Sequence, residues 1–528
     1  MNISQFKLSI IVTLFTFSIH AQDLNIVEEG LLYVSPNSSV YVGGNSSISS
    51  NGELIMDSVS DDFSDFYVVG SSSGSAEYRH FTSSLDTKDL VSPPVSGQIF
   101  SEFATNNSGK IAAGTLSSSS NLLYGPLDNN TSSYYVEYSP ESSEILVAAK
   151  GYRAGTMSGN DGQTLSYKGD VNTVDTDIML TYGQGQFKHN NLIGNPFTTH
   201  LNTEKIMDHI VDNSSIDPRY KAMYLYNGSV LQAFPWTTVN MNNRASSGME
   251  LLTPGQAFIV ISVPSPSSPF TFPATARQIS WTEQDNSIEG RYSSSAAPYS
   301  SSAPSFLNLK LSKQSMSYTT SIYFNNAGSR GLDQGYDAGS LGSHLGTHLA
   351  EDSEGLNLSI QTLPIEDLTS TDYSIPIDVT VAAGEEATLS FSDLSIPSGV
   401  SFYLDDTELN IQTLLTSNSY TFTTTTDLNG IGRFYIRTVA NTFSAESIAL
   451  NSVEVFSLTS SKNLTVRGQL LNDSVLKIYD IRGRLISSHF LESNQTEHKI
   501  DVSNVSPGVY VINLNNQNQT KTTKLVIN

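Results

Sequence analysis

The chain has 528 residues, of which 38% are hydrophobic and 15% are charged, and its formal net charge is −24. That length exceeds what a single hydrophobic core normally organises, so we expect several domains. The negative charge argues against nucleic acid as a partner, because phosphate groups would be repelled. The absence of cysteine excludes disulfides, thiolate metal sites and a cysteine nucleophile.

Serine, threonine, asparagine and glycine are abundant in the sequence. This mixture is typical of strands with small polar outer faces rather than of charged helices. We therefore predict an all-β protein with little helix. It should contain several β-sandwich-like domains in series and end in a small immunoglobulin-like sandwich.

The first 21 residues predict a secretory signal peptide. Lys7 precedes a largely apolar run over residues 8–19, and Ala21 stands directly before Gln22. We expect cleavage between Ala21 and Gln22 and passage through the periplasm. The apolar run is too short to span a bilayer as a helix, and no later stretch reaches about 20 apolar residues. The mature chain is therefore expected to have no transmembrane span.

The next segment, residues 22–75, is predicted to be β-rich at the N-terminus of the mature chain. Short apolar alternations in it are broken by Gly43-Gly44 and Asn51-Gly52, as expected for short strands joined by tight turns. We interpret this segment as a small β unit or a capping layer.

Residues 76–290 are predicted to form a β-sandwich-like domain. Two of its strands have the sequences NLIGNPF at residues 191–197 and PGQAFIV at residues 254–260, apolar runs bounded by turn residues. Residues 203–211 place apolar side chains at helical spacing, with Asn202 or Thr203 available to cap the first turn, and so predict one short helix.

The second half of the chain begins with a predicted linker, residues 291–305, which is rich in serine, alanine and proline and has little to bury. From Leu307 onward apolar and polar residues alternate, which predicts half-buried strands. Residues 306–440 should therefore form a second β-sandwich domain, followed by a short linker at residues 441–451.

The final module is predicted at residues 452–528. The apolar patterns predict strands on both sides of the turn at Arg482-Gly483, and alternate apolar residues in residues 508–514 predict a strand covered on both faces. A compact sandwich of about 75 residues is expected. The expected strands are residues 475–481, 484–487, 509–514 and 524–527.

Three segments of this module carry a resemblance: LKIYDIRGRL at residues 476–485, SPGVYVI at residues 506–512, and the lysine-containing residues 521–528. Together they resemble the type A C-terminal sorting domain of the type IX secretion system, found in the Bacteroidetes. That family usually opens with a Pro-Asn-Pro-like turn, whereas this chain has VEVFSL at residues 453–458. The motif residues that the resemblance implies are Tyr479, Asp480, Gly483, Gly508, Tyr510 and Lys524.

The resemblance implies that the type IX machinery is a partner and that the protein is secreted or displayed on the outer cell surface. The machinery would recognise the shape of the folded sorting domain rather than a reactive side chain. The middle of the chain also looks like β-rich regions of large surface proteins of the same phylum. Those regions imply a location and a fold but no chemistry.

Catalytic patterns in the sequence are weak. Ser72 lies in a Gly-x-Ser-x-Gly match, but the nucleophile elbow needs a strand before it and a helix after it, and neither is predicted. His344 and His348, with Glu351 nearby, have the spacing of metal ligands on a helix, but Gly342 and Gly346 favour a solvated loop. We predict no catalytic residue and leave the metal content of the chain open.

Several carboxylates occupy turn-like positions, and none has the spacing of a calcium loop. We predict no cofactor, with a structural calcium ion as the alternative that distant loops could assemble. The carboxylates are Asp61, Asp62, Asp65, Asp333, Asp337, Asp405 and Asp406.

Two further features bear on sugars. A tryptophan in such a domain is more often a core residue than a sugar-stacking platform, although both uses are known. We therefore expect Trp236 and Trp281 to be core residues, with sugar stacking as the alternative. Asp57-Ser58-Val59 and Asp473-Ser474-Val475 resemble the short O-glycosylation motif of the Bacteroidetes. Glycans on Ser58 and Ser474 are therefore a hypothesis.

The sequence favours an exported, non-catalytic cell-surface or secreted protein with an adhesive or scaffolding function. The alternative is a carbohydrate-binding or polysaccharide-processing surface protein, so that a surface glycan or another cell-surface protein would be the partner. A metallohydrolase that uses His344 and His348 is the third hypothesis. Whether the chain is an enzyme stays open at this stage, with the non-catalytic interpretation preferred.

Overall fold

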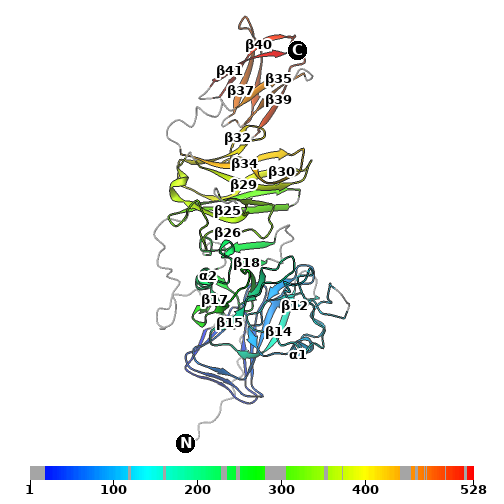
Figure 1. The fold of residues 1–528 in the computed structure, drawn as a ribbon, viewed down its shortest axis with the longest axis vertical. Coiled ribbons are helices and arrows are strands. Elements are labelled where there is room, and N and C mark those ends of the chain that lie inside the picture. The colour runs from blue at the N-terminus through cyan, green and yellow to red at the C-terminus, as the bar shows by residue number, and fades with distance from the viewer. Residues whose placement is uncertain are drawn as a thin grey trace. The chain divides into compact units, whose positions relative to one another are not determined.

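The computed structural model divides into two compact units, residues 1–302 with 334–338 and residues 303–333 with 339–528. Strands dominate both units, and the described residues contain two α-helices (Figure 1). The predicted all-β fold class is thus confirmed. The structure describes residues 18–116, 120–157, 162–226, 235–244, 250–279, 305–314, 316–349, 355–370, 373–440, 453–457, 462–468, 470, 473–493, 495–516 and 520–527.

The first unit begins with a parallel β-coil of three turns, the blue part of Figure 1. Each turn contributes one strand to each of three sheets, with strand orders β1-β4-β7, β2-β5-β8 and β3-β6-β9. All these pairings are parallel. The strands are β1 Ser18–Ala21, β2 Leu24–Ile26, β3 Leu31–Val34, β4 Ser39–Val42, β5 Ser46–Ile48, β6 Glu53–Asp57, β7 Asp65–Val68, β8 Ser72–Ser73 and β9 Ser75–Thr82.

The coil is held by an apolar interior to which each turn contributes. Val42, Met56 and Val68 are fully buried there. The sequence predicted the short strands but not their repeat. Ser18 pairs with Ser39 and Ser39 with Asp65, so the second step is longer than the first in this sheet, whereas the steps from Leu31 to Glu53 and from Ile55 to Glu77 are equal. The repeat is therefore irregular within each turn.

One end of the coil is closed by residues 198–200. The Phe66 amide donates to the Thr198 carbonyl at 2.8 Å, and the Thr198 hydroxyl donates to the Phe66 carbonyl at 2.8 Å. The Asp65 carboxylate accepts hydrogen bonds from the amide and from Nδ1 of His200, at 2.9 and 2.8 Å. Both backbone groups of Phe66 are therefore satisfied at this edge of β7, as a buried strand edge requires.

The coil continues directly into an antiparallel sheet, because β9 also pairs with β14 in the strand order β11-β14-β9-β6-β3. Helix α1, Phe100–Asn106, packs here and was not predicted. It has only seven residues, and its N-cap residue Ile99 offers no side-chain hydrogen bond, so the usual sequence signals are missing. The strands are β10 Asp89–Val91, β11 Val95–Ser96, β12 Tyr124–Pro126, β13 Tyr152–Ala154, β14 Gln163–Val171 and β15 Thr176–Met179.

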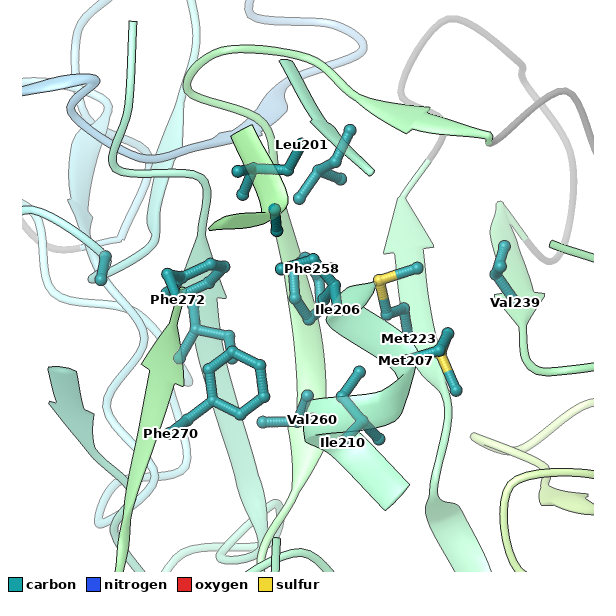
Figure 2. Packing of buried hydrophobic residues seen from close by; sticks show 14 of the residues in the cluster. Leu201, Ile206, Met207, Ile210, Met223, Val239, Phe258, Val260, Phe270 and Phe272 are labelled. Atoms are coloured by element: carbon teal, nitrogen blue, oxygen red, sulfur yellow. The ribbon is translucent and has the colours of Figure 1, made fainter. Parts of the chain in front are cut away.

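The predicted helix is confirmed as α2, Thr203–Asp212, capped by the Asn202 side chain, which accepts from the Lys205 amide at 3.1 Å. Ile206, Met207 and Ile210 of α2 join one apolar core with Phe258 and Val260 (Figure 2). The surrounding elements are β16 Asn190–Gly194, β17 His200–Asn202, β18 Met223–Tyr226, β19 Trp236–Val239, β20 Leu251–Leu252, β21 Ala257–Ile261, β22 Pro269–Phe272, β23 Arg277–Gln278 and the 3-10 helices Pro218–Tyr220 and Ala274–Ala276.

The two apolar motifs of this region are neighbours in space. β16, from NLIGNPF, pairs antiparallel with β21, from PGQAFIV. Asn195 follows β16 and is fully buried. Its side chain donates to the carbonyls of Thr199, Leu252 and Thr253 and accepts from the Phe197 amide. An amide that is satisfied in this way fixes a loop inside a core.

His80 lies in β9 with its ring beside those of Phe63 and Tyr167, at centroid distances of 5.5 and 6.4 Å. It is 4% exposed. Burial lowers the pKa of His80 from 6.5 to about 4. Because the folded pKa lies below the unfolded one, the stability linked to the neutral ring is complete above pH 6.5 and is lost as the pH falls toward 4.

Replacing His80 with leucine should remove that part of the acid sensitivity. From the shift to about 4, the wild-type chain should lose about 3 kcal/mol between pH 6.5 and pH 4 through this residue. Urea unfolding of both chains at several pH values measures the difference in slope. A His80→Leu chain with an unchanged slope would show that the ring does not remain neutral in the fold.

The second unit contains one large sheet with the strand order β32-β31-β34-β29-β27-β28-β25-β24-β30-β33. Its two end strands, β32 and β33, are consecutive in the chain and are joined by residues 415–419. The sheet must therefore curl until its edges approach each other. The strands are β24 Ser305–Lys313, β25 Met316–Asn325, β27 Leu345–Thr347, β28 Leu358–Pro364, β29 Ser374–Val381, β30 Glu386–Ser395, β31 Val400–Asp406, β32 Ile411–Leu414, β33 Tyr420–Thr423 and β34 Leu428–Ala440.

The predicted alternation in this unit is confirmed in β24, where Leu307, Leu309 and Leu311 are fully buried between half-buried polar residues. It is wrong for β28. Leu358 and Ile360 are buried as expected, but the next residue, Gln361, is buried as well. The reason is that β28 is an interior strand with a parallel neighbour, β25. A strand covered on both faces does not alternate.

Two predicted linkers, residues 291–305 and 441–451, lie almost entirely outside the described residues. Their role and the domain boundaries that they define stay predictions. None of the helices in the described ranges has the length and apolar character needed to cross a membrane. Ala21 ends β1 and Gln22 follows it, so the expected signal-peptide cleavage would remove that strand.

Candidate recognition face of the C-terminal module

The last described part of the chain forms a sandwich with a core of its own. One sheet has the order β35-β36-β39 and the other β38-β37-β40-β41. Leu464, Leu476, Ile478 and Ile512 are among its fully buried residues. The strands are β35 Glu454–Ser457, β36 Asn463–Arg467, β37 Ser474–Asp480, β38 Leu485–Leu491, β39 Glu497–Asp501, β40 Gly508–Asn515 and β41 Thr520–Ile527.

Asp480 and Gly483 build the turn between β37 and β38. The Asp480 carboxylate accepts from the amides of Arg482 and Arg484, at 3.0 and 2.9 Å. These hydrogen bonds, that of Arg484 first, lower the pKa of Asp480. Gly483 has φ +78°, a conformation that other residues rarely adopt. Both motif residues therefore shape the hairpin.

Tyr510 anchors β40 in the core. It is 8% exposed, and its hydroxyl donates to the Ser506 carbonyl at 2.7 Å, which ties the strand to the turn before it. Gly508 begins the same strand, and a Cβ there would meet nothing closer than the Tyr510 ring at 3.5 Å. Sterics therefore do not explain a glycine at position 508.

Tyr479 and Lys524 lie on the outer face of the four-stranded sheet. Tyr479 stands opposite Leu485 on one side and Val511 on the other, and Val511 stands opposite Lys524. These four residues make one row across all four strands. The outer face of this sheet, here called the recognition face, consists of Val475, Lys477, Tyr479, Leu485, Ser488, Phe490, Val509, Val511, Asn513, Asn515, Thr520, Thr522, Lys524 and Val526.

The recognition face carries exposed apolar side chains among its polar residues. Phe490 is 63% exposed, Val526 56% and Leu485 49%, and Val509 pairs directly with Val526. The prediction that residues 508–514 are covered on both faces is therefore wrong, since only Tyr510, Ile512 and Leu514 are buried. Neighbouring exposed apolar side chains, such as Val509 and Val526, are a feature of surfaces that contact a partner.

The module also differs from the rest of the chain in charge. Residues 453–528 contain eight Lys and Arg and six Asp and Glu, whereas the whole chain has a net charge of −24. Lys477 and Lys524 belong to the recognition face itself. An apolar face that also carries lysines suits a partner surface with acidic groups around an apolar centre.

Ser72 does not form a nucleophile elbow. It lies in the two-residue strand β8, and strand β9 rather than a helix follows it. The structure thus lacks the strand–turn–helix geometry that exposes a catalytic serine.

His344 and His348 flank strand β27 and do not lie in the solvated loop that was expected. His348 is buried, and its Nε2 lies 2.8 Å from the Asp378 carboxylate. His344 stacks on Tyr318 with ring centroids 4.6 Å apart. The third expected ligand, Glu351, lies outside the described residues. Across the described ranges no three His, Asp or Glu gather as a metal site would require.

The candidate calcium ligands are mostly engaged in hydrogen bonds or ion pairs within the protein. Asp65 bonds His200, as described above, and Asp406 pairs with Arg433 at 2.8 Å. Asp405 pairs with Arg437 at 3.0 Å, and Asp333 accepts from Ser329. Asp61 and Asp62 are exposed in a turn, and Asp337 is buried. The engaged carboxylates stabilise loops and strands locally.

Trp236 is half-buried in β19, with its ring 5.3 Å from that of Tyr226, and Trp281 lies outside the described residues. The two candidate O-glycosylation serines are both buried, Ser58 at 1% and Ser474 at 0% exposure. The Ser58 hydroxyl donates to the Arg79 carbonyl and accepts from the Phe81 amide. The folded chain therefore presents neither hydroxyl to a modifying enzyme.

Comparison with known families places both parts of the chain. The model described as "Secretion system C-terminal sorting domain" matches residues 459–528, and the model described as "Domain of unknown function (DUF8693)" matches residues 2–438. No curated protein matches the chain. A solved structure titled "Biofilm associated protein - BSP domain" is 9% identical, with a TM-score of 0.14 over 28% of this chain and 29% of that chain, a likeness too low to support any argument. The chain belongs to the DUF8693 family and ends in a secretion system C-terminal sorting domain, which directs it to the cell surface or beyond it.

Proposed function

We propose that the protein is a non-catalytic adhesive or scaffolding protein of the cell surface, delivered by the type IX secretion machinery. The observation that carries the export part of the proposal is the sorting module, which has its own core and exposed apolar side chains on one face. The expected signal peptide supports the first step of export. Partners on the outside would be a surface glycan or another cell-surface protein.

The recognition face is the part of the module that we assign to the secretion machinery. Recognition of a folded tag needs side chains that are exposed and held by a rigid support. Tyr479 is partly exposed on β37, between β38 and β40, and Lys524 is exposed on the edge strand β41, which pairs with β40. Asp480, Gly483 and Tyr510 hold the support in shape. Of the six motif residues, Tyr479 and Lys524 are thus assigned to recognition, and Asp480, Gly483 and Tyr510 to the structure of the module. Gly508 receives neither assignment.

Removing the apolar side chains of the recognition face should block export without unfolding the module. We expect a Leu485→Ser, Phe490→Ser, Val526→Ser chain to reach the surface at less than a tenth of the wild-type level. Exposed side chains of this kind contribute within about 0.5 kcal/mol each to stability. Protease accessibility on intact cells measures export, and attachment of the same cells to a surface should fall in parallel.

A matched control replaces exposed valines elsewhere: Val27, Val69 and Val174 are 55%, 51% and 70% exposed, and their serine variants should be exported normally. Normal export of the face variant would remove the recognition face from the proposal. Unchanged attachment by cells that have lost the protein from their surface would contradict the adhesive function.

A further inference from the structure

A groove opens in the second unit where the large curled sheet meets itself. It is an open depression of about 570 Å³ between residues 390–394 of β30 and residues 415–419, the connection between the two end strands. We call it the seam groove. Its volume is in the range of small-molecule sites, about 300–1,000 Å³.

A β-bulge shapes one wall of the groove. Leu309 of β24 stands opposite Phe391, but Asn308 stands opposite Asp393, so Ser392 is an extra residue in β30. Its hydroxyl donates to the Asn308 carbonyl at 3.3 Å. Such an insertion bends a strand and changes the direction of the side chains that follow it, and bulges are frequent beside binding sites. Here it turns Asp393 outward at the groove.

The opposite wall is a loop with a fixed conformation. The Thr416 hydroxyl accepts from the Phe402 amide at 2.7 Å, and the Leu415 amide donates to the Phe402 carbonyl at 2.9 Å. The Asn418 side-chain NH₂ donates to the Leu414 carbonyl at 3.0 Å. The loop is therefore preorganised, which reduces the entropy that a ligand must overcome.

The groove combines an aromatic ring with polar groups that can accept further hydrogen bonds. Phe391 stands opposite fully buried Leu309, so it faces the inner side of the sheet at the edge of the groove; it is half-buried and packs edge-on against buried Phe402, with centroids 6.0 Å apart. Asp393 stands opposite Asn308 and is exposed on the outer side. Asn418 retains its carbonyl oxygen, and the Asp393 carboxylate accepts in this structure only from its own neighbour, the Leu394 amide, at 2.8 Å. Serine hydroxyls at 390, 417 and 419 complete the lining.

This combination favours a neutral sugar over other ligands. Sugar hydroxyls both donate and accept hydrogen bonds, as serine and asparagine do, and a carboxylate accepts two at once. The C–H face of a pyranose ring can pack on an aromatic ring. The lining has one carboxylate and no Lys, Arg or His, so an anionic ligand would find a repelling charge and no counterion.

We propose that the seam groove binds a neutral saccharide, with Phe391 as the stacking surface and Asp393 and Asn418 as hydrogen-bonding groups. The inference rests on the proposed adhesive function and names its ligand class. The two remain separable, because adhesion through a protein partner would need no sugar.

The test probes the mature full-length chain on an array of neutral oligosaccharides and then titrates the strongest binder. Phe391→Leu, Asp393→Ala and Asn418→Ala should each weaken binding at least tenfold, which is about 1.4 kcal/mol. Glu386→Ala is the matched control, since Glu386 is an exposed carboxylate at the other end of the same strand; it should bind within twofold of wild type. Thermal unfolding of each variant confirms that its fold is retained.

Three results would overturn the inference. They are an array without any bound neutral saccharide, binding that the three groove variants leave unchanged, and binding restricted to acidic glycans. If cells nevertheless attach through the protein, the proposed function stands without the groove. If the cells also fail to attach through the protein, both the saccharide inference and the proposed adhesive function are contradicted.

Discussion

Deletion of residues 452–528 is expected to leave the remaining protein folded but retained in the periplasm. The sorting module has its own apolar core, and in the described residues each of its strands pairs only with other strands of the module. Removing the module therefore exposes no unpaired strand edge of the large sheet. Export should fall to the background level, because the element that the machinery recognises is gone.

Cell fractionation and protease accessibility measure where the truncated chain is found, and circular dichroism of the purified chain checks its fold. The control is the same truncated chain with residues 452–528 restored, which should return it to the surface. Normal surface exposure of the truncated chain would contradict the export route. A truncated chain that unfolds would show instead that the module is an integral part of the preceding core.

Asp406→Ala is expected to destabilise the second unit by about 3–5 kcal/mol. Asp406 is 1% exposed, and its carboxylate accepts from Arg433 at 2.8 Å and from the Tyr420 hydroxyl at 2.7 Å. It also accepts from the amides of Glu408 and Leu409. The variant would leave a buried guanidinium and several donors with fewer partners, which is the costly way to break an ion pair.

The neighbouring Asp405→Ala is the matched control. Asp405 pairs with Arg437 at 3.0 Å, but the two side chains are 21% and 22% exposed, and such pairs contribute about 0–1 kcal/mol. Urea unfolding of the two variants measures the difference. Equal effects would show that burial does not distinguish the pairs. A rise in stability on adding calcium to wild type that both variants lose would show that Asp405 and Asp406 are ligands after all.

The elements with strong local patterns were predictable from the sequence. Helix α2 has a capping asparagine and apolar residues at helical spacing, and β24 alternates leucine with polar residues; both formed as predicted. Helix α1 and the parallel coil were not predictable in this way. The first has no side-chain cap, and in the second the steps between paired strands are unequal in two of the three sheets.

The recognition face shows how a sequence pattern can be correct and its interpretation wrong. The sequence correctly places Val509 and Val511 on a second apolar face of β40. The prediction that both faces are buried followed from this pattern and is wrong. Only the tertiary structure shows that nothing in the described module covers them. The seam groove was beyond prediction for another reason, since it depends on a bulge at Ser392 and on two segments brought together by sheet curvature.

The position of β41 has a consequence for export. Along its whole length β41 pairs with β40, from Thr520 opposite Asn515 to Ile527 opposite Gly508, and it supplies Lys524 and Val526 to the surface that we assign to the secretion machinery. A chain without this strand would lose both side chains and leave the edge of β40 unpaired. We expect the secretion machinery not to export such a chain.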